Sequence, residues 1–575
     1  MAEFDLVIKG GTVVDGTRVP KYAADVGIKD GKIAQIGGIR SSDGAEVLDA
    51  SGQIVAPGFV DLHTHYDAQI QWDPYCTISG WHGVTSVVLG NCGFGFAPVR
   101  EEERDRAMLT MSRTEAIPFE SMKEGMIWDW VTFPEWLDTL DRIPKGVNTL
   151  SYMPLAPLMI WTMGLEAAKN RRATDGEITE MQRLLDEAMD AGACGWSTQR
   201  LGEHSVQADY DGTPMVTDIM SDNECLAMAE VLRKRDEGFI QITQFTGDIK
   251  ADLAFQAKLA ATSGRPVLHN VVAVRADRAD VHRKRLKWLA DCNARGERVF
   301  GQGVTMRAGF AFTLEEWNLY DSSPSWNYAT TGERAEKLQK MADPEVRAGI
   351  RDEIDDAVKK LGQTQAIGGP IEELLIQHVE HLEEYEPFVG KTVGDLAKAN
   401  GQHAVDAMLD LAIATDLKAE FITPDTDMSA DFQGEVMESP YTIPGVSDGG
   451  AHTKFFTGGS YTTDFLCWLV RDEEKVTLEE AHYRLSQLPA HAAGFKDRGV
   501  LREGAPADVV VYDLEKLKVV PEWTGEIVHD FPGGEWRRVQ RAEGYRWTLV
   551  NGEVTFENGQ ETGATPGRLL RHGRG

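Results

Sequence analysis

The stretch GFVDLHTH, residues 58–65, joins a short apolar run to two histidines at its end. Seven similar runs follow, and several are separated by longer segments whose apolar residues have helical spacing. The seven runs are GVTSVVLGNCG (83–93), GVNTLSYMPL (146–155), GACGWSTQRL (192–201), GFIQITQF (238–245), RPVLHNVV (265–272), RVFGQGVTM (298–306) and YTIPGVSDGG (441–450). Strands that alternate with helices indicate an α/β fold, and eight of them predict a (β/α)8 TIM barrel.

The segments between these runs differ in length. ATDGEITEMQRLLDEAMDAG, residues 173–192, has the spacing of an amphipathic helix that ends at a glycine. Residues 307–437 are too many for one connection and contain a further helical pattern, PEVRAGIRDEIDDAVKKLG. We expect these residues to form a lid-like insertion over the barrel mouth.

Both ends of the chain read as β-structure. DLVIKGGTVVDG (5–16) and ADVGIKDGKIAQIG (24–37) lie near the start, and TLVNGEVTFENG (548–559) lies near the end. Dipeptides such as Asn551-Gly552 favour tight hairpins. We predict one small β-sandwich built from residues 1–57 and 500–575, with a barrel domain of residues 58–499 between them.

Composition narrows the class of protein. The chain has 575 residues, 42% of them hydrophobic, and a formal net charge of −32. That charge repels phosphate backbones, so nucleic acid is not expected as a partner. No apolar run is long enough to span a membrane, and the N-terminus does not read as a signal peptide. Six scattered cysteines do not suggest a disulfide framework, and we expect a cytoplasmic protein with reduced thiols.

Ligand-type side chains gather at the predicted strand ends. In a TIM barrel the active site lies at the C-terminal ends of the strands. His63 and His65 close the first run, two positions apart, and therefore face the same side. Cys92 closes the second run, His269 lies on the sixth, and Asp448 ends the eighth. Imidazole, thiolate and carboxylate are the ligands that zinc prefers, so we predict a zinc site from these five residues.

Three motifs give a family resemblance over nearly the whole chain. PGFVDLHTHYD (57–67) resembles the first metal motif of the amidohydrolase superfamily, and GNCG (90–93) with SDG (447–449) resembles its D-aminoacylase (N-acyl-D-amino-acid deacylase) branch. The resemblance implies hydrolysis of an amide or related carbonyl bond, and a metal position shared by the Cys92 thiolate. Many members of the superfamily bridge two metals with a lysine, and the third and fourth runs here contain none.

The chain departs from the branch pattern at several positions. Gln244 stands where the fifth run would supply a metal-binding histidine, and a carboxamide is a poor zinc ligand. We therefore expect one tight zinc site, with room for a second, weaker site near His269. Val271 replaces a lysine that would hold a substrate carboxylate, and the loop after the fourth run lacks the branch's usual tyrosine. These changes predict a rebuilt substrate pocket. The aromatic residues of 315–328 could line that pocket, or they could serve only to anchor the lid.

Other charged or titratable residues give weaker signals. Lys454, His204 and Arg307 are candidate substrate-binding residues, and each also reads as an ordinary surface side chain. His378 and His381 have no third ligand nearby in the sequence, which favours an exposed pair. His82 precedes the second run, at the end of the barrel opposite the active site, and is expected to be structural.

The ligand set suggests a mechanism. Zinc lowers the pKa of a bound water to near 7, and Asp448 is placed to act as general base and then as general acid toward the departing amine. The substrate would be a small-molecule amide, and the sequence leaves its acyl group, its amine and the oligomeric state open. Two alternatives remain: a cyclic-amide hydrolase of the dihydropyrimidinase or hydantoinase kind, and a non-catalytic binding protein that kept the scaffold.

Overall fold

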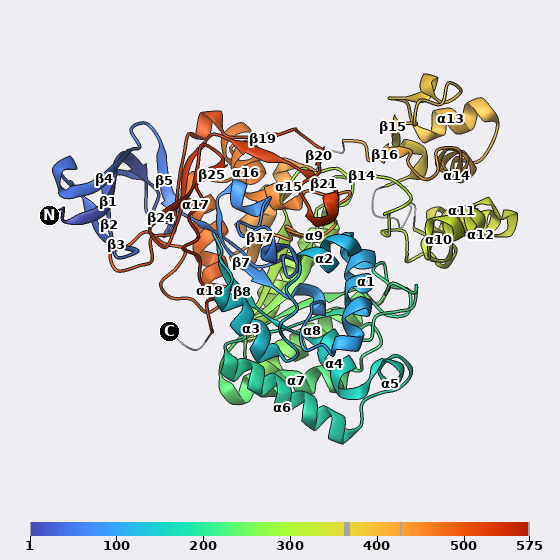
Figure 1. The fold of residues 1–575 in the computed structure, drawn as a ribbon, viewed down its shortest axis with the longest axis horizontal. Helices are drawn as coiled ribbons and strands as arrows, with labels where there is room; N and C mark the ends of the chain where they lie inside the picture. The colour runs from blue at the N-terminus through green and yellow to red at the C-terminus, as the bar shows by residue number, and fades with distance from the viewer. Residues whose placement is uncertain (1, 362–368, 426–427, 573–575) are drawn as a thin grey trace.

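A core of parallel strands lies at the centre of the computed structural model, which describes residues 2–361, 369–425 and 428–572 (Figure 1). Each of the eight predicted runs contains a strand. The strands are β6 (Phe59–Asp61), β7 (Val84–Leu89), β8 (Asn148–Ser151) with β9 (Met153–Pro154), β10 (Gly195–Arg200), β11 (Phe239–Gln244), β12 (Val267–Val272), β13 (Val299–Val304) and β17 (Thr442–Gly445).

The core strands pair in the order in which they occur along the chain. One parallel sheet runs β6-β7-β8, and a second runs β9-β10-β11-β12-β13-β17. A parallel bridge between Thr64 and Gly449 joins the segment after β6 to the segment after β17. Because all strands point the same way, their C-terminal ends meet at one edge of the core.

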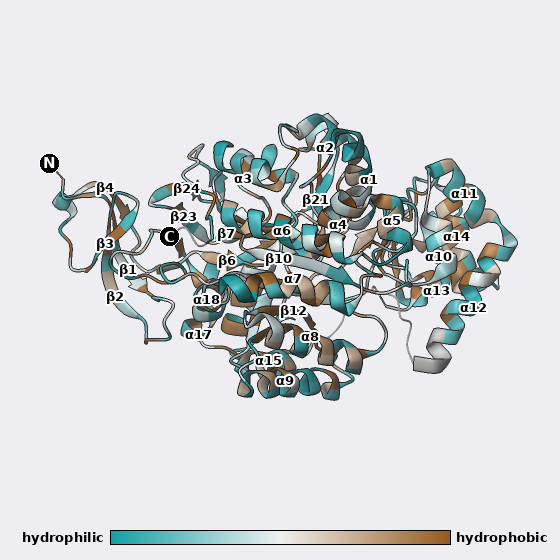
Figure 2. Ribbon diagram, turned by 90° about the horizontal axis from the view of Figure 1, so that it is seen from below, coloured by the Kyte–Doolittle hydropathy of each residue, from teal (hydrophilic) through white to brown (hydrophobic). Residues whose placement is uncertain are grey.

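Each core strand has two distinct faces. One face contributes to a common apolar cluster, with Val60, Leu62, Val88, Leu150, Tyr152, Phe239, Leu268, Phe300 and Ile443 among its members. The alternate positions, such as Ile240 and Ile242 of β11, pack in a separate cluster that includes helix residues. The helices α8 (Ile249–Ser263), α9 (Ala279–Ala294) and α15 (Ala430–Glu438) cover one side of the strands (Figure 2). A strand residue therefore points either to the shared interior or to the helices.

The helix predicted between the third and fourth runs is α6 (Asp175–Ala191). Thr174 accepts a hydrogen bond from Glu177 N in a capping box, and Gly192 follows the last turn with a φ of 114°. Only glycine adopts such a backbone readily, which explains why the helix ends there.

Both chain ends contribute to one nine-stranded sheet. Strands β1 (Phe4–Val13) to β5 (Ile54–Pro57) come from the N-terminal end, and β18 (Val509–Tyr512), β23 (Tyr545–Val550), β24 (Glu553–Glu557) and β25 (Gln560–Glu561) from the C-terminal end. The two ends meet where β18 pairs with β5. Two further two-stranded sheets lie within residues 518–543, and the two-layer arrangement of the predicted sandwich stays a prediction.

Most of residues 307–437 form a separate lobe, seen at the right of Figure 1. Its helices are α10 (Pro324–Thr330), α11 (Arg334–Ala342), α12 (Pro344–Leu361), α13 (Val393–Asn400) and α14 (Ala404–Ala414). Its small sheet has the strand order β14-β16-β15, with bounds β14 (Ala311–Phe312), β15 (Leu375–His378) and β16 (Glu420–Ile422). Its apolar core also includes Ala116 and Phe455 from outside the lobe. The last helix of the range, α15, instead contacts α9 and β17 of the parallel-strand core.

The aromatic residues at 315–328 belong mainly to the core of this lobe. Trp317, Tyr320 and Trp326 are buried there, whereas Tyr328 is exposed. The three buried residues therefore anchor the lobe and do not line an open pocket. In the part of the chain that the structure describes, no helix combines the length and apolarity that crossing a bilayer needs.

Candidate metal centre

Two histidines reach the metal centre directly after β6. The carbonyl oxygen of His63 accepts a hydrogen bond from Ser447 Oγ at 2.8 Å, and His65 N donates to the Gly449 oxygen at 2.7 Å. The intervening Thr64 donates from Oγ1 to the Val88 oxygen at 2.6 Å. These bonds hold the segment between β7 and β17, so both imidazoles enter at the C-terminal edge of the strands.

Cys92 lies in a tight turn after β7. Gly90 and Gly93 have positive φ values, and Cys92 itself has a φ of 55°. A side chain at Gly93 would put its Cβ 2.9 Å from Thr198 Cα, so the turn can pack against β10 only with glycine there. Gln241 Oε1 accepts a hydrogen bond from Cys92 N at 2.8 Å. The GNCG motif thus fixes the direction of the thiol.

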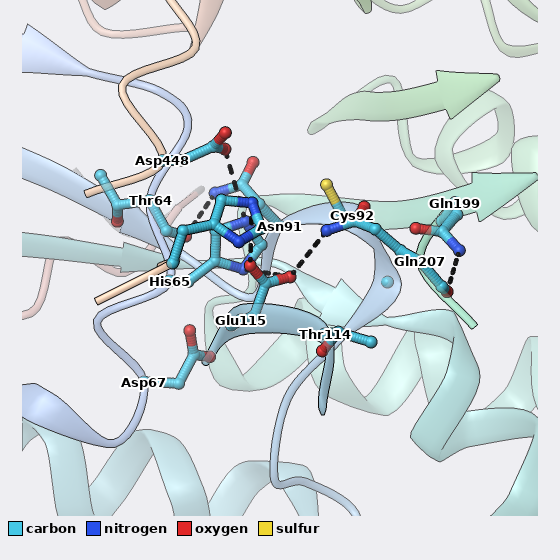
Figure 3. Close-up of polar contacts among 12 residues, drawn as sticks. Thr64, His65, Asp67, Asn91, Cys92, Thr114, Glu115, Gln199, Gln207 and Asp448 are labelled. Carbon is cyan, nitrogen blue, oxygen red and sulfur yellow. Dashed lines mark hydrogen bonds and ion pairs between the residues drawn. The ribbon is translucent and has the colours of Figure 1, made fainter. Parts of the chain in front are cut away.

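The side chains of His63, His65 and Cys92 converge, and Figure 3 labels His65, Cys92 and the nearby Asp448. Their ligand atoms all lie within 4.8 Å of one another, and all three residues are buried. Asp448 comes in from the segment after β17: its Oδ1 is 3.2 Å from His63 Nε2 and 3.8 Å from His65 Nε2. Cys92 Sγ is 3.4 Å from His63 Nε2. The structure therefore brings four of the predicted ligands together.

The orientation of His63 suits metal binding. Its Nδ1 lies 3.2 Å from Gln302 Oε1 on β13, a group that accepts a hydrogen bond. Donation from Nδ1 leaves the Nε2 lone pair directed at Cys92 and Asp448. Four donors of the types that zinc prefers, three of them inaccessible to solvent, form a set that fits a zinc ion.

The charges at the centre depend on one another. Burial raises the pKa of the Cys92 thiol, although His63 counteracts part of that effect. Burial would also raise the pKa of Asp448, but the hydrogen bond from His63 and the nearby imidazoles lower it well below its usual range. A cation among these groups would stabilise both anions.

The structure does not bring His269 to this centre. Its Nδ1 lies 2.8 Å from Gln256 Oε1 on α8, and its ring packs edge-on against Trp288 of α9 with centroids 5.2 Å apart. The neighbouring Leu268 points to the shared interior of the strands. Because side chains alternate along a strand, His269 must face the helices, and the prediction of a metal ligand there is corrected.

Gln244 is displaced from the site for the same reason. The β11 side chains that meet the metal centre are Gln241 and Thr243, whose Oγ1 is 3.2 Å from Cys92 Sγ. On β12 the corresponding residue is Asn270, whose Nδ2 donates to Thr243 Oγ1 at 3.0 Å. The side chains that β11 and β12 present on this side, Thr243 and Asn270, are thus a hydroxyl and a carboxamide, which are weak zinc ligands.

The candidate substrate-binding residues have other partners or lie exposed. Lys454 is 3% exposed, and its Nζ lies 2.9 Å from Glu535 and 4.0 Å from the Trp536 ring centroid. Arg307 forms an ion pair with Asp464 at 2.7 Å. His204 is exposed in the loop after β10. The two cations are thus neutralised by carboxylates of the protein.

The remaining histidines behave as the sequence suggests. His381 has a side chain that is 92% exposed, and His378 lies 3.0 Å from Glu380 at the surface. His82 is fully buried, with Nδ1 2.7 Å from Thr463 Oγ1 and Nε2 3.0 Å from the Gln540 oxygen. These contacts give His82 a structural role.

Two buried residues beside the centre were not predicted. Glu115, the last residue of α1 (Arg104–Glu115), is fully buried with Oε1 3.9 Å from His65 Nδ1 (Figure 3). His452 Nε2 lies 3.7 Å from Glu115 Oε2. Burial, with the nearby Asp448 charge, raises the pKa of Glu115 well above its usual value. The closeness of His452 to Asp448 in the sequence was an available signal, whereas nothing in the local pattern marks Glu115.

Comparison with known proteins agrees with this geometry. The sequence profile of the amidohydrolase family matches residues 46–556, and the chain belongs to that family. An uncharacterized protein of Mycobacterium tuberculosis is 28% identical, covering 99% of this chain and 96% of the relative. The N-acyl-D-glutamate deacylase of Alcaligenes xylosoxydans xylosoxydans is 26% identical, covering 99% and 97%.

Among solved structures, the N-acyl-D-glutamate deacylase of Bordetella bronchiseptica, in complex with zinc and a phosphonate inhibitor, has a TM-score of 0.67 at 23% identity. The match covers 99% of this chain and 100% of the other. These similarities place the chain in the D-aminoacylase branch. It is a hydrolase of carbon–nitrogen bonds other than peptide bonds.

Proposed function

We propose that the protein is a zinc-dependent hydrolase of an N-acyl amino acid or related amide. The core strands, joined through the Thr64–Gly449 bridge, would form one closed (β/α)8 barrel. His63, His65, Cys92 and Asp448 would hold one tightly bound zinc ion. Zinc, when bound, supplies a water of lowered pKa and a positive charge that polarises the carbonyl group.

The exposure of Asp448 is the observation that carries the proposal. The side chains of His63 and His65 are 1% and 2% exposed, whereas that of Asp448 is 21% exposed. Its Oδ1 faces the imidazoles, so the other carboxylate oxygen is left for water and substrate. In our proposal Asp448 takes a proton from the attacking water and delivers it to the departing amine, which leaves poorly unless protonated.

The alternative function with the same chemistry is hydrolysis of cyclic amides, as in enzymes of the dihydropyrimidinase or hydantoinase kind. The absence of lysine from β8, NTLS, and β10, GWSTQR, disfavours it, because relatives of that kind generally carry the bridging lysine. We also propose that the preferred substrate has no free carboxylate that must pair with a protein cation. Val271 replaces the expected lysine, and Lys454 is paired with Glu535.

Elemental analysis combined with a hydrolysis screen tests the proposal. The purified protein should contain about one zinc per chain, following the single-site logic of catalytic zinc. It should cleave N-acyl amino acid derivatives faster than hydantoins or lactams, and the rate should fall when a chelator removes the metal. Faster cleavage of the cyclic amides would favour the alternative, and no cleavage of any amide by zinc-loaded protein would refute the proposed activity.

A further inference from the structure

Glu115 is a buried carboxyl group beside the metal centre that the proposed ligand set does not use. Its side chain is 1% exposed. Among the described residues its ion-pair partners are two imidazoles, those of His65 and His452, and no lysine or arginine pairs with it there. Burying a carboxyl group costs free energy unless a partner compensates for the lost water. The position of Glu115 therefore indicates a role that involves these imidazoles.

The end of α1 is attached to the segment that carries Asp448. Ala116, with a φ of 49°, ends the helix directly after Glu115. Thr453 N donates to the Glu115 carbonyl oxygen at 3.3 Å, and Thr453 Oγ1 donates to the Ala116 oxygen at 2.5 Å. Because Asp448 and Thr453 belong to the same segment after β17, these bonds fix Glu115 relative to the metal centre.

The two carboxyl oxygens of Glu115 face different imidazoles. Oε1 lies 3.9 Å from His65 Nδ1, and Oε2 lies 3.7 Å from His452 Nε2. Oε1 also accepts a hydrogen bond from Gln207 Nε2 at 3.5 Å, and Figure 3 shows the Gln207 side chain directed at Glu115. His65 Nδ1 is buried and has no hydrogen-bond partner among the described residues. Glu115 is thus the acceptor nearest to hand for a proton on that nitrogen.

The two metal-binding histidines can be compared at the ring nitrogen that does not face the centre. His63 Nδ1 lies 3.2 Å from the Gln302 oxygen, which leaves Nε2 for the metal. In His65 it is Nε2 that lies toward Asp448, 3.8 Å from Oδ1, so Nδ1 is again the nitrogen on the outer side. Histidines that bind metals almost always donate a hydrogen bond from this second nitrogen, which orients the ring and makes the ligand more basic.

We propose that Glu115 is a positioning residue, whose Oε1 accepts the Nδ1 proton of His65 and so holds the imidazole with Nε2 directed at the zinc ion. This inference rests on the proposed zinc site. The 3.9 Å separation exceeds the ~2.7–3.2 Å of an N–H···O hydrogen bond, and a small rotation of the carboxyl group closes the difference. A cation at Nε2 makes the Nδ1 proton more acidic, which favours this contact.

The test measures zinc affinity by competition with a chromogenic chelator, which needs no turnover. Glu115→Met fills a similar buried space without a strong acceptor and should weaken zinc binding roughly 10–100-fold, the usual effect of losing such a partner. Glu115→Gln keeps an oxygen that accepts a hydrogen bond, so it should lose less affinity than Glu115→Met. Glu115→Ala, which also removes the acceptor, replaces the methionine variant if that variant folds poorly.

Thr114→Val is the matched control, because Thr114 is fully buried in the same turn of α1 and its Oγ1 donates only to the Thr110 oxygen, at 2.9 Å. It should leave zinc affinity unchanged. Nitrogen-15 NMR of histidine-labelled, zinc-loaded protein gives a second readout, which a merely structural role of Glu115 would not move. The hydrogen bond to Glu115 should shift a ring N–H proton downfield, and Glu115→Met, unlike Thr114→Val, should abolish that shift.

The possible outcomes separate this inference from the proposed function. Unchanged zinc affinity in Glu115→Met, or an unchanged N–H resonance, would overturn the role of Glu115 alone. A wild-type protein that binds no zinc would refute the proposed metal site and this inference with it. Tight zinc binding without hydrolysis of any amide would refute the proposed activity, and the affinities of the variants would still decide the role of Glu115.

Discussion

Asp448 differs from the other side chains of the metal centre in both exposure and backbone. Its φ is 47°, a conformation that residues other than glycine seldom adopt, and it lies in the turn that also positions Ser447 against His63. The surrounding contacts hold this turn, and the turn directs one carboxylate oxygen at the imidazoles. The same arrangement leaves the rest of the carboxylate accessible, as a proton-transferring group requires.

Asp448→Asn separates metal binding from proton transfer. Asparagine retains an oxygen that can face the metal but cannot carry the proton, so zinc content should stay near that of the wild type. Turnover should fall by roughly 10²–10⁴-fold, the usual contribution of general acid–base assistance. Metal analysis and steady-state kinetics on the same preparation provide the measurement. Near-normal turnover would show that another group acts as the base.

His63→Ala and His269→Gln form a matched pair for the metal ligands. His63→Ala should reduce zinc from about one ion per chain to a small fraction, with a parallel loss of activity, because it removes an imidazole from a single tight site. His269→Gln should retain the zinc, since His269 contacts Gln256 and Trp288. Loss of zinc from the His269 variant, or two equally tight ions in the wild type, would contradict the four-residue site.

The sequence predicted the chemical types at the centre better than their exact positions. The motifs around His63, Cys92 and Asp448 are specific enough to identify the residues that converge at the metal centre. On β11 and β12, however, the side chains that face the centre are Thr243 and Asn270, each adjacent to the residue predicted. Strand periodicity is two, so an error of one residue reverses the face, and sequence patterns rarely locate a strand to that precision.

At the scale of elements, buried histidines join segments that are distant in the sequence. His82 connects the turn before β7 to α16 (Tyr461–Phe465) through Thr463 and to the C-terminal region through the Gln540 carbonyl. A carbonyl oxygen only accepts hydrogen bonds, so Nε2 must carry the proton of a neutral ring. Burial lowers the pKa of His82 to about 4.

This burial predicts a loss of stability in acid. An unfolded histidine has a pKa near 6.5, so below that pH the unfolded chain binds the proton that buried His82 resists. Neutral His82 makes its full contribution to the free energy of unfolding above pH 6.5. As the pH falls toward 4, protonation of the unfolded chain lowers that free energy by an amount on the order of 3 kcal/mol. In His82→Gln the midpoint of urea unfolding should therefore depend less on pH between 7 and 4. His381→Gln, at a side chain 92% exposed, should show the wild-type dependence.

The elements with strong periodicity were predictable, and the exceptions have physical causes. The helix at 173–192 and the hairpin-rich ends carry their own capping and turn signals, so local sequence determines them. The division of 307–437 depends on tertiary contacts instead. Nothing in the sequence of α15 distinguishes a helix that packs on α9 from one that belongs to the lobe.

At the scale of the whole molecule, the charge distribution disfavours anionic substrates. The formal net charge is −32, and the two cations considered as substrate anchors, Lys454 and Arg307, are paired with Glu535 and Asp464. A field of this sign lowers the local concentration of anions. The lobe packs through Ala116 and Phe455 against the segments that carry Glu115 and His452, so it lies beside the metal centre.

The last prediction compares an N-acyl-D-amino acid with its methyl ester, which has the same acyl group and no carboxylate. We expect kcat/KM to be about tenfold higher for the ester, because partial desolvation of an unpaired carboxylate costs upward of about 1.4 kcal/mol. Raising the ionic strength should improve the rate with the acid and leave that with the ester nearly unchanged, because salt screens only the charged encounter. Lys454→Ala should not alter the acid-to-ester ratio of kcat/KM, because the Lys454 ammonium group already forms an ion pair with Glu535. A preference for the free acid that Lys454→Ala abolishes would show instead that Lys454 exchanges Glu535 for the substrate, and that the loss of a lysine at Val271 is compensated from the segment after β17.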